Sequence, residues 1–342
     1  MKHRIAVIGA GMAFEPHAKS LSDLAARIEV AAVVTRDAGR QAATRARYAF
    51  PVSGDLDAIV ADRSIDAALV LTPPHAHLPV IRALAAAGKH VLVEKPLAPT
   101  AADARAAVRA CAEAGVTLAV VLQHRFRPAA LALAEAIAAG ELGAIATAAV
   151  SIRWWRPQSY YDEPGRGTLA RDGGGVLLTQ AIHTLDLFLT LAPPVREVTA
   201  FTGTSAAHRM ETEDSAAGAV RFANGALGSI DATTAAYPGF PERIEFSGTR
   251  ATAVLAGSRL ELLAQDGGRR AVGEAAGTGG GADPMAFAHD HHRAVLAEFL
   301  DALDAGREPR NSGASTLPAL DLIEALIASS AQRRPVCLPT PT

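Results

Sequence analysis

The chain has only two cysteines, Cys111 and Cys337, among 342 residues, and no spacing of Cys and His that is typical of a zinc site. We therefore expect neither a disulfide framework nor a bound metal. The formal net charge is −2 and no basic run occurs, which argues against a nucleic-acid partner. No apolar run approaches the roughly 18 residues that cross a membrane, and the first residues do not resemble an export signal. These absences predict a soluble globular protein, and we expect it in the cytoplasm.

What the chain does have is a strict alternation of short apolar runs and helical patterns over residues 1–123. The apolar runs are rich in valine and isoleucine, which is typical of strands buried on both faces of a parallel sheet. The expected strands are 4–8, 29–35, 66–71, 90–93 and 117–122, and the expected helices are 16–27, 37–49, 55–61, 76–87 and 100–114. The pattern predicts an α/β domain of the doubly wound, Rossmann type over residues 1–123.

The second part, residues 124–342, changes to alternating apolar and polar residues. The expected strands are 144–155, 195–204, 215–222, 227–234, 243–247, 251–255 and 259–264, with helices at 129–139, 293–303 and 317–331. Asn224-Gly225 between two of these runs indicates a hairpin. We predict an α+β domain with an open, mostly antiparallel sheet. Because helices cover one face of such a sheet, we expect a homodimer or homotetramer through the other face.

A glycine-rich turn, Gly9-Ala10-Gly11-Met12-Ala13, connects the first expected strand to the first helix. Gly9 permits the tight turn, and Gly11 lets backbone amides approach a pyrophosphate at the helix N-terminus. Phe14 replaces the third glycine of the dinucleotide-binding pattern, so the helix is expected to sit slightly off or to begin later, at Pro16. Gly9, Gly11, Met12 and Ala13 are the expected dinucleotide contacts.

The end of the second strand bears on the choice between NAD and NADP. An acidic residue there would bind the ribose hydroxyls of NAD. Thr35 and Arg36 come first in this chain, a hydroxyl and a cation that suit a 2′-phosphate. Asp37 is one residue late and is expected to cap the next helix. The pattern favours NADP, with NAD as the alternative.

Two further segments follow the carboxyl ends of expected strands. The loop after one of them contains Thr72, Pro73 and Pro74, and the two prolines force it to extend over the sheet edge. His77 follows and could contact a bound ligand or carry a proton, although helix capping or surface exposure is the commoner role of such a histidine. Residues 88–97 form a buried strand that ends in Glu94, Lys95 and Pro96. The Lys95–Pro96 bond is of the kind that can be cis. The carboxyl edge is where an open α/β sheet binds its ligand.

The order and spacing of Gly9-x-Gly11, Thr72-Pro73-Pro74-x-x-His77, Gly88-Lys89-His90-Val91 and Glu94-Lys95-Pro96 resembles the Gfo/Idh/MocA family of oxidoreductases. The resemblance implies a nicotinamide-dependent enzyme that acts on a sugar, cyclitol or related polyol. It also implies that Glu94 and Lys95 lie at the cofactor and that Lys95 contacts the reacting hydroxyl.

Residues 173–186, which run from three glycines through Thr179, Gln180 and His183 to Asp186, resemble a second motif of that family. In the family this histidine faces the nicotinamide, so the resemblance implies a catalytic role for His183 in proton transfer. Many members carry an acidic residue four positions earlier. This chain has Thr179 there, which cannot exchange a proton near neutral pH. We therefore assign acid–base chemistry to Lys95 and His183, and substrate positioning to Thr179 and Gln180.

Other candidates for substrate contact are less specific. Arg125 follows the last strand of the first domain and resembles the family's segment that enters the second domain. Trp155, Arg156 and Tyr161 lie in a segment that holds both tryptophans of a chain only 5% aromatic. Such side chains can hold a sugar ring and an anionic group, or they can simply pack the interface between two domains or subunits. His289, His291 and His292 open a late helix, where a metal site is the less favoured interpretation.

The sequence thus predicts a hydride-transferring oxidoreductase of sugars or polyols. Two alternatives remain open, a non-catalytic dinucleotide-binding regulator of the same fold and a redox-neutral, NAD-dependent glycoside hydrolase.

Overall fold

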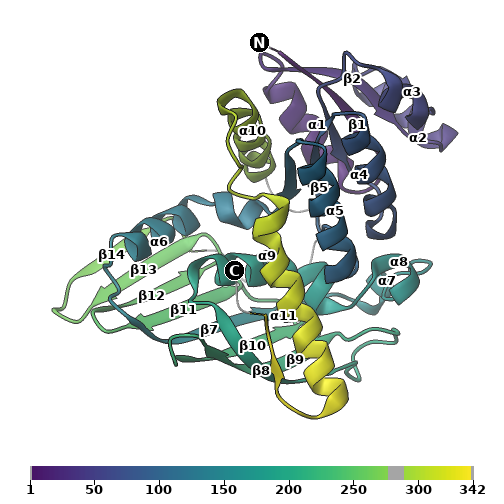
Figure 1. The fold of residues 1–342 in the computed structure, drawn as a ribbon. Helices are drawn as coiled ribbons and strands as arrows, with labels where there is room; N and C mark the ends of the chain where they lie inside the picture. The colour runs from purple at the N-terminus through teal and green to yellow at the C-terminus, as the bar shows by residue number, and fades with distance from the viewer. Residues whose placement is uncertain (1, 276–288, 340–342) are drawn as a thin grey trace. The chain divides into compact units, whose positions relative to one another are not determined.

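The computed structural model describes residues 2–275 and 289–339, and these form two compact units (Figure 1). The first unit contains residues 2–123 together with 289–317, and the second contains 124–275 together with 318–339. The sequence expectation had assigned everything after residue 123 to one second domain. The late segment belongs with the first unit because α10 (Asp290–Ala305) packs on α1 (Phe14–Asp23).

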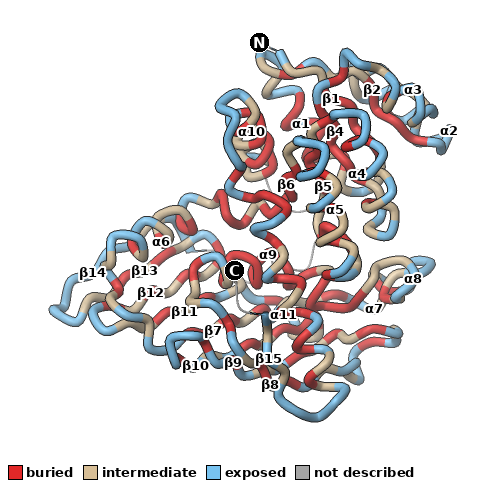
Figure 2. The backbone as a smooth tube through the Cα atoms, in the orientation of Figure 1, coloured by how far each residue is buried: buried red, intermediate tan, exposed pale blue. Residues whose placement is uncertain are grey.

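The described residues of the first unit form a parallel six-stranded sheet in the order β3-β2-β1-β4-β5-β6. Its strands are β1 (His3–Ile8), β2 (Ile28–Val34), β3 (Val52–Ser53), β4 (Ala67–Val70), β5 (His90–Glu94) and β6 (Leu118–Val121). The strand order reverses at β1 and β4, and ligands of open α/β sheets bind outside the carboxyl ends at such a point. Figure 2 shows the central strands as buried, as expected for a sheet covered on both faces.

Three helices of this unit, α2, α3 and α5, begin at a capping side chain. Asp37, Asp55 and Thr100 each accept a hydrogen bond from the backbone N–H three residues later, which satisfies one unpaired donor of the helix N-terminus. The helices are α1, α2 (Ala38–Arg47), α3 (Leu56–Ala61), α4 (His77–Ala86), α5 (Ala101–Glu113) and α10, with the 3₁₀ turn η1 (Pro74–Ala76) before α4. α1 starts at Phe14 and not at Pro16, because the Phe14 ring packs edge-on against Tyr48, with ring centroids 5.4 Å apart.

The described residues of the second unit form a nine-stranded sheet in the order β14-β13-β12-β11-β7-β10-β9-β8-β15. Only β7 and β10 pair in parallel among these neighbours, so the sheet is mostly antiparallel, as predicted. The strands are β7 (Ile145–Arg153), β8 (Val195–Gly203), β9 (Ser215–Phe222), β10 (Leu227–Thr233), β11 (Arg243–Gly248), β12 (Ala251–Ala256), β13 (Arg259–Ala264), β14 (Arg269–Val272) and β15 (Val336–Cys337).

Buried and exposed residues alternate along β8, β9 and β10, so one face of this sheet is covered and the other is open (Figure 2). The helices of the unit are η2 (Gln123–Phe126), α6 (Pro128–Ala138), α7 (Gln158–Tyr161), α8 (Leu169–Asp172), the π-helical turn η3 (Leu177–Ala181), α9 (Ile182–Leu191) and the longer part of α11 (Gly313–Gln332). The stretch Leu169–Leu191 is long and apolar enough to span a membrane, by length and composition, whereas the sequence analysis had expected no such run. Its most apolar window is 83% buried within the protein, as is usual for a core helix.

Candidate active site

The turn between β1 and α1 leaves room for a ligand beside Gly11. Gly9 has φ +110° and a Cβ there would lie 2.9 Å from the backbone carbonyl of Leu71, so only glycine fits this approach of the chain to the end of β4. A Cβ on Gly11 would meet only Nη1 of Arg40, at 4.0 Å. Ala13 provides no side-chain cap for the first turn of α1, and Met12 is exposed. An open helix N-terminus beside a guanidinium fits an anionic dinucleotide phosphate.

The loop after β4 lies beside this turn and carries an unsatisfied polar atom. Thr72 Oγ1 is buried and has no hydrogen-bond partner among the described residues. Buried hydroxyls are normally hydrogen-bonded, so this one fits a group that binds a ligand. Pro73 is exposed. His77 is fully buried, and its ring nitrogens contact the carbonyl oxygens of Thr72, Pro96 and Leu97 at 2.7–3.2 Å. His77 therefore connects the loops after β4 and β5 to each other, and its burial lowers its pKa.

The end of β2 carries the side chains that were expected to distinguish NAD from NADP. Thr35 is buried, while Arg36 is exposed. Asp37 caps α2, with its carboxylate 2.7 Å from the backbone nitrogen of Arg40, as the sequence predicted. Arg40 itself lies near Gly11, so the first turn of α2 adds a second cation that the sequence reasoning did not identify.

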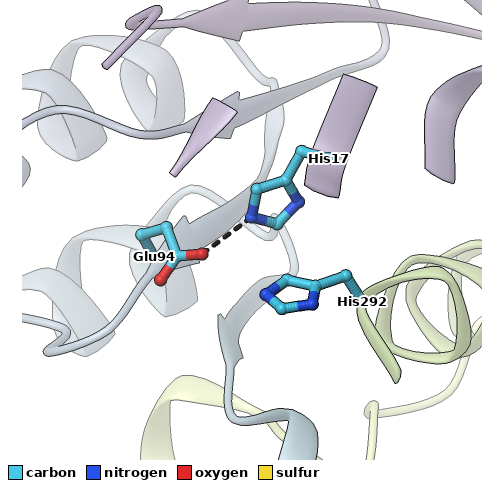
Figure 3. Close-up of side chains that lie close together, drawn as sticks. All are labelled: His17, Glu94 and His292. Atoms are coloured by element: carbon cyan, nitrogen blue, oxygen red, sulfur yellow. Dashed lines mark hydrogen bonds and ion pairs between the residues drawn. The ribbon is translucent and has the colours of Figure 1, made fainter. Parts of the chain in front are cut away.

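At the end of β5, Glu94 and Lys95 are both partly buried, and the Lys95–Pro96 bond is cis. Figure 3 shows the Glu94 side chain facing His17 of α1 and His292 of α10. His17 Nε2 and Glu94 Oε1 are 2.7 Å apart, and the Lys95 backbone N–H donates to Glu94 Oε2 at 3.0 Å. Burial alone would raise the pKa of Glu94, but the hydrogen bond with His17 and nearby positive charge lower it below its usual range. The carboxylate beside Lys95 is therefore ionised at neutral pH.

In the second unit, the helix that carries His183 begins with the π-helical turn η3, a feature often found at functional sites. Glu213 forms the support for this start. Its backbone carbonyl accepts the N–H of Val176, and its carboxylate accepts the N–H of Leu177. A Cβ on Gly175 would lie 2.0 Å from the Glu213 carbonyl oxygen. The last of the three glycines is thus required by packing.

His183 is buried and stacks on His124, with ring centroids 5.1 Å apart. Arg127 donates to His124 Nε2 at 2.6 Å. Because a guanidinium can only donate, His124 accepts a hydrogen bond on that nitrogen. The Thr179 hydroxyl lies 2.7 Å from the Gly175 carbonyl and 2.5 Å from Oε1 of the buried Gln180.

Arg125 and Asp186 form a buried ion pair. Arg125 donates from Nε and Nη2 to the two carboxylate oxygens at 2.6 and 2.5 Å. Burial raises the pKa of Asp186, and the charge of Arg125 opposes this shift. Asp186 therefore has a partner other than His183, and the Arg125 guanidinium is occupied by it.

The aromatic segment packs around a second buried pair, His208 and Asp214, which lie 2.6 Å apart. Trp155 and Tyr161 contact the His208 ring at centroid distances of 5.9 and 4.8 Å. The Tyr161 hydroxyl hydrogen-bonds Thr234 and burial raises its pKa to about 12. Arg156 is buried, with its guanidinium over Trp154 and Tyr160 at about 5.5 Å. Of these candidates, Trp155 is the more accessible, whereas Arg156 and Tyr161 lie in the interior.

Comparison with known proteins agrees with this geometry. Residues 3–122 match the model of the oxidoreductase family with an NAD-binding Rossmann fold, and residues 130–254 match the GFO/IDH/MocA C-terminal domain. The chain belongs to the Gfo/Idh/MocA oxidoreductase family. It is a nicotinamide-dependent oxidoreductase, which confirms the resemblance seen in the sequence and the expected fold class.

Three relatives illustrate the similarity. D-apiose dehydrogenase of Paraburkholderia graminis is 29% identical over 97% of this chain and 88% of its own length. Inositol 2-dehydrogenase of Rhizobium meliloti is 27% identical over 99% of this chain and 100% of its own length. The crystal structure of the WlbA dehydrogenase from Bordetella pertussis, in complex with NADH and UDP-GlcNAcA, is 30% identical with a TM-score of 0.85 and full coverage of both chains.

Three contacts of the site escaped the sequence reasoning. His17 was unmarked within a helix, Arg40 lay outside any motif, and Glu213 is 38 positions beyond the Gly175 that it contacts. The sequence signal that could have identified His17 is its position on the first helix after the glycine-rich turn. It lies about one helical turn after Phe14, and both residues are buried.

Proposed function

We propose that the protein is an NADP-dependent dehydrogenase that oxidises a secondary alcohol, or a hemiacetal CH–OH, of a sugar, cyclitol or related polyol. The observation that carries the proposal is the place of Lys95. It directly follows an ionised, partly buried carboxylate at the carboxyl end of β5. The loop after β4, which carries Thr72, lies beside it, and the strand order of the sheet reverses at β4. Ligands of this fold class bind at that edge.

We assign the proton chemistry to Lys95 and His183. In the oxidation, the substrate O–H proton passes to one of these bases, a carbon–oxygen double bond forms, and the C–H bond breaks. The nicotinamide supplies the hydride acceptor when bound. Lys95 in its charged form also stabilises negative charge on the substrate oxygen. Thr179, Gln180, Trp155, Arg156 and Tyr161 are proposed to position the substrate, with Arg125 placing this region through Asp186.

Two cations support the choice of NADP over NAD. Arg36 is exposed at the end of β2, and Arg40 lies near Gly11. Asp37, the acidic residue that could bind a ribose hydroxyl, already accepts the backbone N–H of Arg40. Together with Thr35, Gly9, Gly11, Met12, Ala13, Thr72, Pro73, His77 and Glu94, these residues are the proposed cofactor contacts.

The relatives guide the choice of substrates to test. Apiose, inositol and a UDP-linked sugar acid appear in their names and complexes, so a panel of aldoses, cyclitols, uronates and UDP-sugars covers the proposed class. Reduced cofactor is measured by absorbance with NADP⁺ or NAD⁺. Net reduction that depends on one of these compounds is the expected result.

Variants separate the proposal from its alternatives. Lys95→Ala should lower turnover by about 10³-fold or more while cofactor affinity stays nearly constant, and the exposed Lys19→Ala is the matched control. A chain that binds the cofactor but turns over no compound of the panel would indicate a regulator. Glycoside cleavage with no net change of the cofactor would indicate the redox-neutral hydrolase.

We also propose that the open face of the second unit's sheet binds a second copy of the chain. Phe201 and Leu227 on β8 and β10 expose large apolar side chains on it, 76% and 55% accessible. Between them β9 presents Ala217 and Ala219, small residues that allow close approach of another sheet. Leu227→Glu should shift sedimentation from dimer or tetramer to monomer, whereas Leu169→Glu, at another exposed leucine, should not. The cytoplasm remains the proposed compartment.

A further inference from the structure

The cluster formed by His17, Glu94 and His292 lies next to Lys95, and the motifs of the sequence do not explain it (Figure 3). Its three members come from α1, β5 and α10, and both histidines are almost completely buried. Ligand atoms of the three side chains lie within 4.8 Å of one another. Buried polar groups cost stability unless they are paired, and here His17 and Glu94 pair with each other.

The distances describe a hydrogen-bonded chain that runs from His17 through Glu94 to the backbone of Lys95. His17 Nε2 and Glu94 Oε1 are separated by 2.7 Å, the length of a direct charge-assisted hydrogen bond. The other carboxylate oxygen, Oε2, accepts the backbone N–H of Lys95. Both oxygens of Glu94 are thus occupied by protein donors, one from α1 and one from the catalytic residue itself.

We propose that His17 and Glu94 are positioning residues for Lys95, and that His292 holds the His17 ring in place by packing against it. The Glu94 carboxylate holds the Lys95 backbone, and its negative charge acts on the Lys95 side chain. His17 keeps the carboxylate in the orientation that makes both contacts. His292 packs edge-on against the His17 ring, with centroids 5.0 Å apart and planes at 89°.

The charges around this chain are consistent with the assignment. The pKa of His292 is lowered to about 4, first by burial and then by the neighbouring histidines, so His292 is neutral and adds no competing cation. Lys95 is among the charges that lower the pKa of Glu94, and by reciprocity the carboxylate favours the charged form of Lys95. His77 of α4 faces the same region, with its ring tied to the Pro96 and Leu97 carbonyls.

The inference rests on the proposed catalytic role of Lys95, and its main test does not require turnover. The chain has four lysines, Lys2, Lys19, Lys89 and Lys95. Labelling with [¹⁵N, 6-¹³C]lysine therefore gives few backbone amide and side-chain signals, and the Lys95→Arg variant assigns those of Lys95. In the chain without cofactor, Glu94→Gln should lower the pKa of Lys95 by about one unit, because the adjacent negative charge is lost. Glu94→Gln and His17→Ala should both shift the Lys95 amide signal and speed its hydrogen exchange.

Kinetics give the second measurement. His17→Ala should lower kcat about 10–100-fold with little change in KM for the cofactor, because Lys95 is misplaced and not removed. His17→Gln, which keeps a donor near the position of Nε2, should recover most of the loss. His90→Gln is the matched control, since His90 lies at the opposite end of β5 and accepts the backbone N–H of Thr117. It should leave both kcat and the Lys95 signals unchanged.

The outcomes separate the two proposals. If His17→Ala and Glu94→Gln leave the Lys95 signals and kcat as in the wild type while Lys95→Ala is inactive, the positioning role is wrong and the proposed function stands. If Lys95→Ala retains turnover, the proposed function fails, whatever the NMR signals show.

Discussion

Arg125 binds Asp186 through two hydrogen bonds of 2.6 and 2.5 Å, and both side chains are buried in the second unit. This pair joins η2 to the helix that carries His183. Since the guanidinium is held by Asp186, we expect Arg125 to act on the substrate through the placement of that helix.

Removal of Arg125 should therefore affect stability first. Arg125→Leu leaves the Asp186 carboxylate buried without this partner, and we expect a loss of about 3–5 kcal/mol in the free energy of unfolding. The double variant Arg125→Leu, Asp186→Leu should recover most of it. Urea denaturation measures the effect, with the exposed Arg209→Ala as control. A stable Arg125→Leu variant with a raised substrate KM would instead identify Arg125 as a direct substrate contact.

Gly175 is the second test of the helix that carries His183. A methyl group at this position would collide with the Glu213 backbone, 2.0 Å away, and backbone cannot move aside cheaply. Gly175→Ala should destabilise the protein by about 2 kcal/mol or more and lower kcat as His183 is displaced. Gly203→Ala, where a Cβ meets nothing within 4 Å, should be neutral in both measurements. Equal melting temperatures for the two variants would refute the role given to Glu213.

The buried His292 predicts loss of stability in acid. Its pKa is about 4 in the folded chain against an ordinary value of 6.5. The unfolded chain therefore binds the proton more tightly, so the contribution is complete above pH 6.5 and is lost as the pH falls towards 4. At about 1.4 kcal/mol for each pH unit, the total is about 3 kcal/mol.

Urea denaturation between pH 4 and 7 checks this slope. His292→Leu should reduce it, whereas His75→Leu, at an exposed histidine, should keep the wild-type slope. An unchanged slope in His292→Leu would show that other groups cause the acid sensitivity.

The choice of cofactor depends on Arg36. If the exposed guanidinium binds a 2′-phosphate, Arg36→Ala should weaken NADPH binding about 10-fold or more and change NADH binding little. Titration of cofactor fluorescence gives both dissociation constants. Arg109→Ala on α5 is the control. Tighter binding of NADH than of NADPH by the wild-type chain would overturn the preference for NADP.

Much of the fold follows from local patterns in the sequence. The valine- and isoleucine-rich runs of the first unit predicted all its strands except β3, whose two residues are too short to leave a pattern. Gly9 was recognised because the turn itself requires a positive φ. Asp37 was recognised as a cap because a cap and its partner lie three residues apart. Lys95 was marked by its place at the end of a buried strand, while its expected catalytic role and that of His183 came from the resemblance to family motifs.

Contacts between distant segments had to come from the tertiary structure. His292 reaches His17 across 275 positions because α10 returns to the first unit, and no local period records such a return. The contact between Glu213 and Gly175 also joins distant segments. The sequence could place Asp186 one helical turn after His183, but it could not show that Asp186 pairs with Arg125. The sequence by itself determined the elements and the polar residues that follow the strand ends, since these depend on neighbours along the chain. Packing of remote segments decided which carboxylates, histidines and arginines are already occupied by one another.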